Sequence, residues 1–278
     1  MIKRTLYFGS PTYLSLRKEQ LVIQLPEVVK NDSLPDTLKA EAVRTIPIED
    51  IGIVILDNKQ ITITHGVIES LLANNCVLIT CNSNRMPVGL MLPLDGNTTQ
   101  TERFRNQIDA SIPLKKQLWQ QTIQAKIENQ AYVLAKNTDC IVKNMQVWAA
   151  DIKSGDPDNY EARAAVYYWA NIFPQIKDFT RNREGIPPNN LLNLRAIVAR
   201  ALVASGLLPT LGIHHRSKYN AYCLADDIME PYRPFVDTVV YDIVANGSPY
   251  DELTQEIKTK LLNIPVLDVI IGGERSPL

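Results

Sequence analysis

The stretch IGIVIL at residues 51–56 contains no charged or amide side chain. An apolar run of this length, bounded by turn residues, is typical of a β-strand that is buried on both faces. Asp57 and Asn58 end the run, and the alternating ITIT at residues 61–64 predicts a further strand. The centre of the N-terminal region is therefore predicted to be a β-sheet.

Further strand patterns lie on both sides of this run. Residues 13–25 alternate apolar with polar side chains and are interrupted by RKEQ at residues 17–20, which predicts a hairpin. Residues 65–74 place apolar side chains at helical spacing, and CVLIT at residues 76–80 predicts another strand. The polar residues 31–35 predict a loop.

The second part of the chain has a different pattern. Turn residues gather between residues 87 and 101, after which apolar residues recur at helical spacing, most strongly over 191–208. The fold class predicted is α+β, with an N-terminal β-strand-rich domain and a C-terminal, mostly α-helical, catalytic domain. We place these domains at residues 1–88 and 103–278, joined by a linker at residues 89–102.

The composition excludes several classes of protein. The 278 residues carry a net charge of −1, so the protein has no uniformly basic coat for nucleic acid. No G-x-x-x-x-G-K-[ST] or G-x-G-x-x-G motif is present, and the four cysteines form no C-x-x-C pair. No apolar run approaches the ~18 residues of a membrane span, and the N-terminus has no signal core. We therefore expect a cytoplasmic protein without membrane contact.

The first candidate site is Glu161 within DPDNYEARAA at residues 156–165. Asp156 suits a helix N-cap and Pro157 the first helical position, which places Glu161 near the first turn. Small alanines beside the carboxylate would allow another element to approach closely. The alternative is a solvated glutamate on a helix face, which the spacing alone favours.

The second candidate is the segment LGIHHRSK at residues 211–218. Two of the three histidines of the chain, His214 and His215, are adjacent here after a glycine. Adjacent loop residues point in different directions, so we expect at most one to act as a ligand or base. The third histidine, His65, stands alone at a strand–helix junction and is interpreted as structural.

The third candidate is LADDIMEPYRP at residues 224–234. Asp227 and Glu230 are three residues apart and share a helix face, whereas Asp226 points elsewhere. Like charges on one face need a neighbouring cation. Arg233 could supply it in an ion-pair cluster, or a divalent metal could, since two carboxylates and an imidazole suit Mn²⁺ or Mg²⁺. The residues alone leave both alternatives open.

Positive charge is concentrated between residues 181 and 218. The segment contains one acidic residue, Glu184, against six basic ones, which are Arg181, Arg183, Arg195, Arg200, Arg216 and Lys218. This pattern fits an anionic substrate such as a nucleic-acid backbone, although solvated helix faces are the ordinary alternative. Asn189, Asn190 and Asn193 lie in an otherwise apolar helix and could orient the site or bridge helices.

Together these segments resemble the CRISPR adaptation integrase family, the Cas-one endonucleases, in the form found in type II, Cas9-containing systems. The similarity comprises the Glu161 segment, NNLLN at 189–193, and GIHH at 212–215 followed by residues 224–234. RTLYF at 4–8 and PIEDIG at 47–52 also match, so the resemblance extends over essentially the whole chain. Members commonly continue beyond the last residues of this chain, so we expect a C-terminal tail of relatives to be missing here.

The resemblance implies roles for individual residues. It makes Glu161, His215 and Glu230 the catalytic residues and the ligands of Mg²⁺ or Mn²⁺. His215 is preferred to His214 because the family histidine is the fourth residue of G-x-x-H. The residues expected to support the site are Asp227, Asn193 and His214. The charge pattern, and not the resemblance, gives the residues expected to contact the DNA backbone, which are Arg181, Arg183, Arg216 and Lys218.

The resemblance also implies partners and a reaction. Family members form homodimers through the N-terminal domain, and two dimers flank a dimer of a small Cas-two protein to give a heterohexamer. The complex inserts a short DNA duplex at the repeat of a CRISPR array by transesterification, in which a DNA 3′-hydroxyl attacks a phosphodiester. Whether Cas9 and an accessory protein also take part is left open. Two alternatives are a branched-DNA repair nuclease and a DNA-binding scaffold without catalytic activity.

Overall fold

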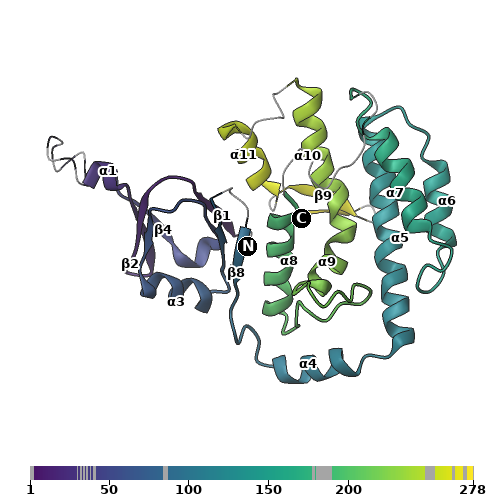
Figure 1. Ribbon diagram of the computed structural model, residues 1–278, viewed down its shortest axis with the longest axis horizontal. Helices are drawn as coiled ribbons and strands as arrows, with labels where there is room; N and C mark the ends of the chain where they lie inside the picture. Colours follow the sequence, from purple (N-terminus) through teal and green to yellow (C-terminus); the bar gives the residue numbers. More distant parts are fainter. Residues whose placement is uncertain are drawn as a thin grey trace. The chain divides into compact units, whose positions relative to one another are not determined.

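A computed structural model describes residues 3–29, 31, 33, 35, 37, 39, 42–83, 87–176, 179, 190–247, 254–264, 267–271 and 274–277. The chain divides into two compact units. The first comprises Met1–Gln100 with Val203–Gly206, and the second comprises Thr101–Leu202 with Leu207–Leu278. The α+β class predicted from the sequence is confirmed, with strands in the first unit and mainly helices in the second (Figure 1).

The first unit contains two four-stranded sheets. One sheet consists, in spatial order, of β1 (Arg4–Phe8), β5 (Ile51–Leu56), β7 (Val77–Cys81) and β8 (Pro87–Met91). The first three strands are parallel, and β8 pairs antiparallel to β7. β5 has a neighbour on each side and its first five residues are buried, which confirms the prediction made from the IGIVIL run.

The other sheet contains the predicted hairpin. Its spatial order is β4 (Arg44–Pro47), β3 (Gln20–Gln24), β2 (Thr12–Arg17) and β6 (Ile61–Ile63). Lys18 and Glu19 connect β2 to β3 with φ angles of 49° and 56°, as a two-residue hairpin turn requires. The short helices α1 (Pro26–Val29) and η1 (Ile48–Asp50) and the helix α3 (His65–Ala73) complete the unit. Leu14, Leu21, Ile51, Val67 and Leu71 are almost completely buried in its core.

Regular structure occupies both ends of the segment predicted as a linker. Strand β8 covers its beginning, and helix α4 (Gln100–Asp109) covers its end. Gly89 permits the pairing of β8 with β7, because a Cβ atom there would lie 2.7 Å from Thr80 Cγ2. The turn-rich composition between residues 87 and 101 therefore marks an edge strand as well as a connection.

Helix α5 (Ile112–Asn137) is the centre of the second unit (Figure 1). It packs against α6 (Lys143–Asp151), α7 (Tyr160–Asn171), α9 (Cys223–Met229), η2 (Glu230–Tyr232) and α10 (Arg233–Ala245). The other elements are α8 (Asn190–Ala204), α11 (Gln255–Leu262), β9 (Asp268–Ile271) and β10 (Glu274–Pro277). The antiparallel pair β9–β10 was not predicted from the sequence.

The apolar stripe of α5 is buried only in part. Ile123 and Ile127 are fully buried, whereas Leu114 and Leu118, which precede them at helical spacing, are exposed. Among the residues that the structure describes, no helix is long and apolar enough to cross a membrane.

Candidate functional site

Glu161 lies in the first turn of α7. The helix begins at Tyr160 and not at Pro157 as predicted, because Asp156 and Asn159 adopt positive φ angles of 50° and 55°. Asp156 nevertheless acts as the cap, since its two carboxylate oxygens accept hydrogen bonds from the backbone N–H groups of Tyr160 and Glu161, both at 2.9 Å. This clamp fixes the backbone from which the Glu161 side chain extends.

Glu230 begins the short helix η2, and its side chain is 4% exposed. Asn129 of α5 donates a hydrogen bond of 2.7 Å to the Pro231 carbonyl and so ties η2 to the central helix. Arg233 Nη2 lies 3.1 Å from Glu230 Oε1, which is the ion pair considered from the sequence. Arg233 balances only one oxygen of this buried carboxylate.

Lys126 of α5 joins the two glutamates. Its Nζ atom lies 2.6 Å from Glu161 Oε1 and 2.6 Å from Glu230 Oε2. Sequence reasoning missed this residue. The available signal was its position three residues after Ile123 on the buried face of α5, where a charged side chain requires a partner of opposite charge.

Asp227 organises the loop that carries the two histidines. Its fully buried carboxylate accepts hydrogen bonds from the backbone N–H groups of Ile213, His214 and His215 at 2.6, 2.9 and 3.2 Å. Gly212 permits this close approach, because a Cβ atom there would lie 2.3 Å from the His215 carbonyl oxygen. Glycine is therefore required sterically at this point of the loop.

The two histidine rings have different surroundings. The His215 Nδ1 atom lies 2.5 Å from Asp227 Oδ1, and this hydrogen bond raises the pKa of the imidazole above its ordinary value. A carboxylate bonded to Nδ1 fixes ring orientation and leaves Nε2 to face a ligand, an arrangement common among metal-binding histidines. The His214 ring instead stacks on Trp119, with ring centroids 4.1 Å apart.

The donor set fits a divalent cation in its chemistry. Glu161 and Glu230 already direct one oxygen each to a single cation, the Lys126 ammonium, and Glu230 Oε2 has no hydrogen-bond partner of proper geometry. Within the described part of the chain, no three His, Cys, Asp or Glu side chains are gathered closely enough to hold a metal ion as they stand. The two glutamates therefore share one cation, the Lys126 ammonium, in this structure.

The basic residues fall into distinct groups. Arg216 and Lys218 are exposed on the loop after His215, where the Lys218 ammonium lies 4.9 Å from the ring of the exposed Tyr219. Arg195 instead forms two hydrogen bonds, of 2.6 and 2.9 Å, with the buried Asp226 carboxylate. Arg195 is therefore engaged within the protein.

Several predicted residues are not described at the side-chain level. Arg181 and Arg183 lie outside the described residues, as do Glu184 and Asn189. Asn190 and Asn193 belong to α8, but their side chains are outside the described part of the structure.

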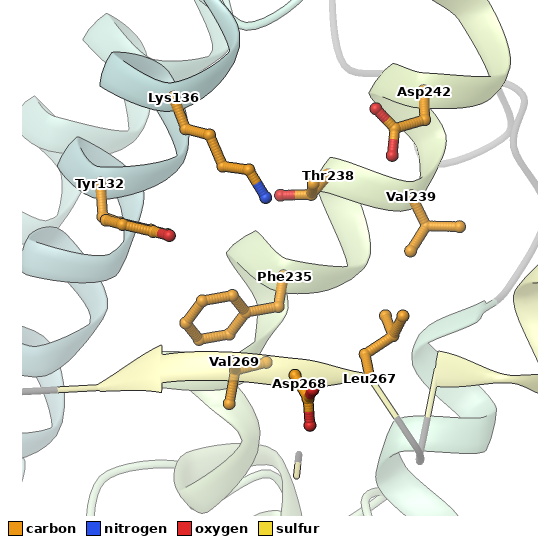
Figure 2. Close-up of a pocket in the computed structure, with 9 residues that line it drawn as sticks. All are labelled: Tyr132, Lys136, Phe235, Thr238, Val239, Asp242, Leu267, Asp268 and Val269. Carbon is orange, nitrogen blue, oxygen red and sulfur yellow. The ribbon is translucent and has the colours of Figure 1, made fainter. Parts of the chain in front are cut away.

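A separate cavity of about 150 Å³ lies between α5, α10 and β9 (Figure 2). Tyr132 and Lys136 of α5 line one side. Phe235 and Val269 lie toward its base, and Asp242 is near its upper edge (Figure 2). Its nine lining residues include neither Glu161, Glu230 nor Lys126, so the cavity is distinct from the paired glutamates.

Comparison with known proteins identifies the family of the chain. Residues 6–256 match the family model described as "CRISPR associated protein Cas1". The chain is a member of the Cas1 family. It is 37% identical over 268 residues to a CRISPR-associated endonuclease Cas1 from Neisseria meningitidis serogroup C (strain 8013), covering 94% of this chain and 83% of the relative. The resemblance inferred from the motifs is thereby confirmed.

Solved structures support the Cas1 fold. A casposase bound to integration product aligns with a TM-score of 0.67 at 18% identity, covering 100% of this chain and 86% of that chain. A CAS1 protein from Thermotoga maritima aligns with a TM-score of 0.65 at 16% identity, covering 94% and 88%. A Cas6-RT-Cas1–Cas2 complex aligns with a TM-score of 0.63 at 18% identity, over 92% of this chain and 29% of that chain.

Proposed function

We propose that this chain is the metal-dependent DNA integrase of CRISPR adaptation, which inserts short DNA duplexes into a CRISPR array. The observation that carries the proposal is the convergence of Glu161 and Glu230 on one cation position. Family membership and the relative named as an endonuclease support nuclease-type chemistry. The similarity in fold to a casposase bound to integration product is consistent with strand transfer.

The ligands proposed for Mg²⁺ or Mn²⁺ are Glu161, Glu230 and His215 through Nε2. When bound, a divalent ion supplies Lewis-acid chemistry that activates a hydroxyl and neutralises charge on a phosphate. Asp227 would accept Nδ1–H of the neutral His215 ring, which fixes the ring orientation and, in that tautomer, leaves Nε2 to bind the ion. Asp156 fixes the first turn of α7 and thereby the position of Glu161.

The proposed reaction is the attack of a DNA 3′-hydroxyl on a phosphodiester of the target strand. The P–O bond to the target strand's 3′-oxygen breaks as the new P–O bond forms, and that oxygen leaves with the proton released by the attacking hydroxyl. One phosphodiester replaces another, so no nucleotide hydrolysis is needed, consistent with the absence of a phosphate-binding motif from the sequence. Arg216 and Lys218 would bind the backbone phosphates, and Tyr219 offers a ring on which a base can stack.

We further propose the assembly known for the family. The strand-rich domain would form the homodimer and contact a small Cas-two protein, and the helical domain would hold the DNA. The fold shared with a Cas6-RT-Cas1–Cas2 complex supports such a partner. A role for Cas9 and an accessory protein is an extension of this proposal that a reconstituted integration assay would test.

The test is strand transfer on a branched DNA that mimics a half-integrated duplex, with Mn²⁺, Mg²⁺ or a chelator. An integrase reseals the target strand and releases the branch in a metal-dependent reaction. Hydrolysis without joined strands would favour the repair nuclease. Tight binding without strand chemistry, unchanged by the chelator, would favour the scaffold.

A further inference from the structure

The proposed mechanism leaves Lys126 without a role, although its ammonium group is buried between the two glutamates of the site. Its side chain is 11% exposed, and its Nζ atom makes two 2.6 Å contacts with carboxylates from two different elements, α7 and η2. A lysine is rarely buried to this degree without compensation. The ammonium therefore occupies the point on which both glutamates converge.

The electrostatics explain why a cation is needed there. Two carboxylates that share a site repel each other, and a nearby positive charge favours their ionised forms. Arg233 contacts Glu230 alone, at 3.1 Å, and so does not join the pair. Lys126 is the described side chain that bridges both glutamates, and it can hold them together when no metal is present.

The ammonium would also compete with a metal ion for the same carboxylate oxygens. A divalent ion binds carboxylate oxygens at about 2.0–2.1 Å for Mg²⁺. The same two oxygens are each 2.6 Å from Nζ, so an ion between them would stand well within contact distance of the ammonium. Two cations at such a separation repel strongly in a partly buried site. The ammonium and the ion therefore cannot share these oxygens in this arrangement.

We propose that Lys126 is a built-in substitute cation, which keeps Glu161 and Glu230 in position without metal and must be displaced when a divalent ion binds. The inference rests on the proposed function in taking these glutamates as metal ligands. The long, flexible lysine side chain suits this exchange, because its ammonium can move without movement of α5. Lys126 is thus a positioning residue, and its presence weakens the affinity of the site for the metal ion.

The experiment measures Mn²⁺ binding to the full chain by isothermal titration calorimetry, without DNA. The variant is Lys126→Met, which keeps most of the side-chain volume and removes the charge. We expect it to bind Mn²⁺ about tenfold or more tightly than the wild type. Lys136→Met, on an exposed position of the same helix, is the matched control and should bind as the wild type does.

Thermal unfolding supplies a second readout. Without metal, Lys126→Met should unfold at a lower temperature than the wild type, because the two carboxylates lose the cation that they share and Arg233 contacts Glu230 alone. Added Mn²⁺ should raise its unfolding temperature more than that of the wild type. If Lys126→Met does not fold, Lys126→Gln replaces it, and Lys126→Arg, which retains the charge, should show no gain in affinity.

The outcomes separate this inference from the proposed function. Equal or weaker Mn²⁺ binding by the neutral variants would overturn the inference, because Lys126 would then only support the glutamates, while the metal site itself would stand. If neither the wild type nor any variant binds Mn²⁺, the proposed metal site fails and the inference fails with it.

Discussion

Replacement of Asp227 by asparagine tests the support of the histidine loop. Oδ2 accepts from the backbone N–H groups of Ile213 and His214, and Oδ1 accepts from the backbone N–H and Nδ1 of His215. If Oδ2 becomes the NH₂ group, two of the four hydrogen bonds are lost; if Oδ1 does, the bond from the His215 backbone N–H is lost and the contact with Nδ1 is kept only with donor and acceptor exchanged. Hydrogen bonds to a charged group contribute about 1.5–3 kcal/mol each, so Asp227→Asn should lose at least about 1.5–3 kcal/mol of stability.

The substitution also has a chemical consequence. If the new NH₂ group faces the imidazole, Nδ1 must accept a hydrogen bond, and the proton moves to Nε2. A protonated Nε2 cannot bind a metal ion, so strand transfer should fall even in the fraction of protein that remains folded. Asp227 would thus affect both the stability of the loop and the tautomer of His215.

Urea unfolding followed by tryptophan fluorescence measures this effect, because Trp119 contacts both histidine rings. Asp242→Asn, a change of the same kind at an exposed position of α10, is the control and should leave the free energy of unfolding nearly unchanged. A loss of less than about 1 kcal/mol for Asp227→Asn would show that the carboxylate does not support the histidine loop, since even one buried, charge-assisted hydrogen bond exceeds that value.

Three further predictions concern the loop, the cap of α7 and a cysteine of the sheet. Gly212→Ala should lower the free energy of unfolding by about 1–3 kcal/mol, because its Cβ atom would meet the His215 carbonyl oxygen; an unchanged urea midpoint would contradict this. Asp156→Ala should cost about 1–2 kcal/mol in the same assay by removing the cap that fixes Glu161, whereas Asp156→Asn should retain part of it. Burial raises the pKa of Cys81 to about 11. At pH 8 the alkylation of Cys81 by iodoacetamide, measured by mass spectrometry, should therefore be on the order of 10²-fold slower in the native protein than in the urea-unfolded protein. Equal alkylation rates in the two states would contradict the raised pKa.

The fold could be predicted where local pattern and tertiary environment agree. The buried strand at residues 51–56 and the hairpin around Lys18 and Glu19 follow from apolar spacing and turn chemistry. The pairing of β9 with β10 could not be predicted, because few apolar residues alternate in these short strands. The turn residues between 87 and 101 predicted a connection, whereas in the structure Gly89 permits close pairing of a strand with Thr80.

The candidate site was only partly predictable. The resemblance to the family selected Glu161 and Glu230, although spacing alone favoured a solvated glutamate at position 161, and the structure places both against one cation. Spacing could not select Lys126, because its partners come from segments 35 and about 100 residues away in the chain. The pairing of Arg195 with Asp226 likewise depends on tertiary contact, so the sequence counted Arg195 among the residues available to an anion.

The most direct test of the account is strand transfer by Glu161→Gln, measured with Mn²⁺ on the half-integrated DNA, with DNA affinity measured on the same samples. The variant keeps the size of the side chain and removes one charge from the cation site. If Glu161 holds a catalytic metal ion, joined product should fall on the order of 10²-fold or more, with DNA affinity nearly unchanged. Joining at the wild-type rate, or a loss of activity fully explained by lost DNA binding, would contradict a catalytic metal site at Glu161 and Glu230.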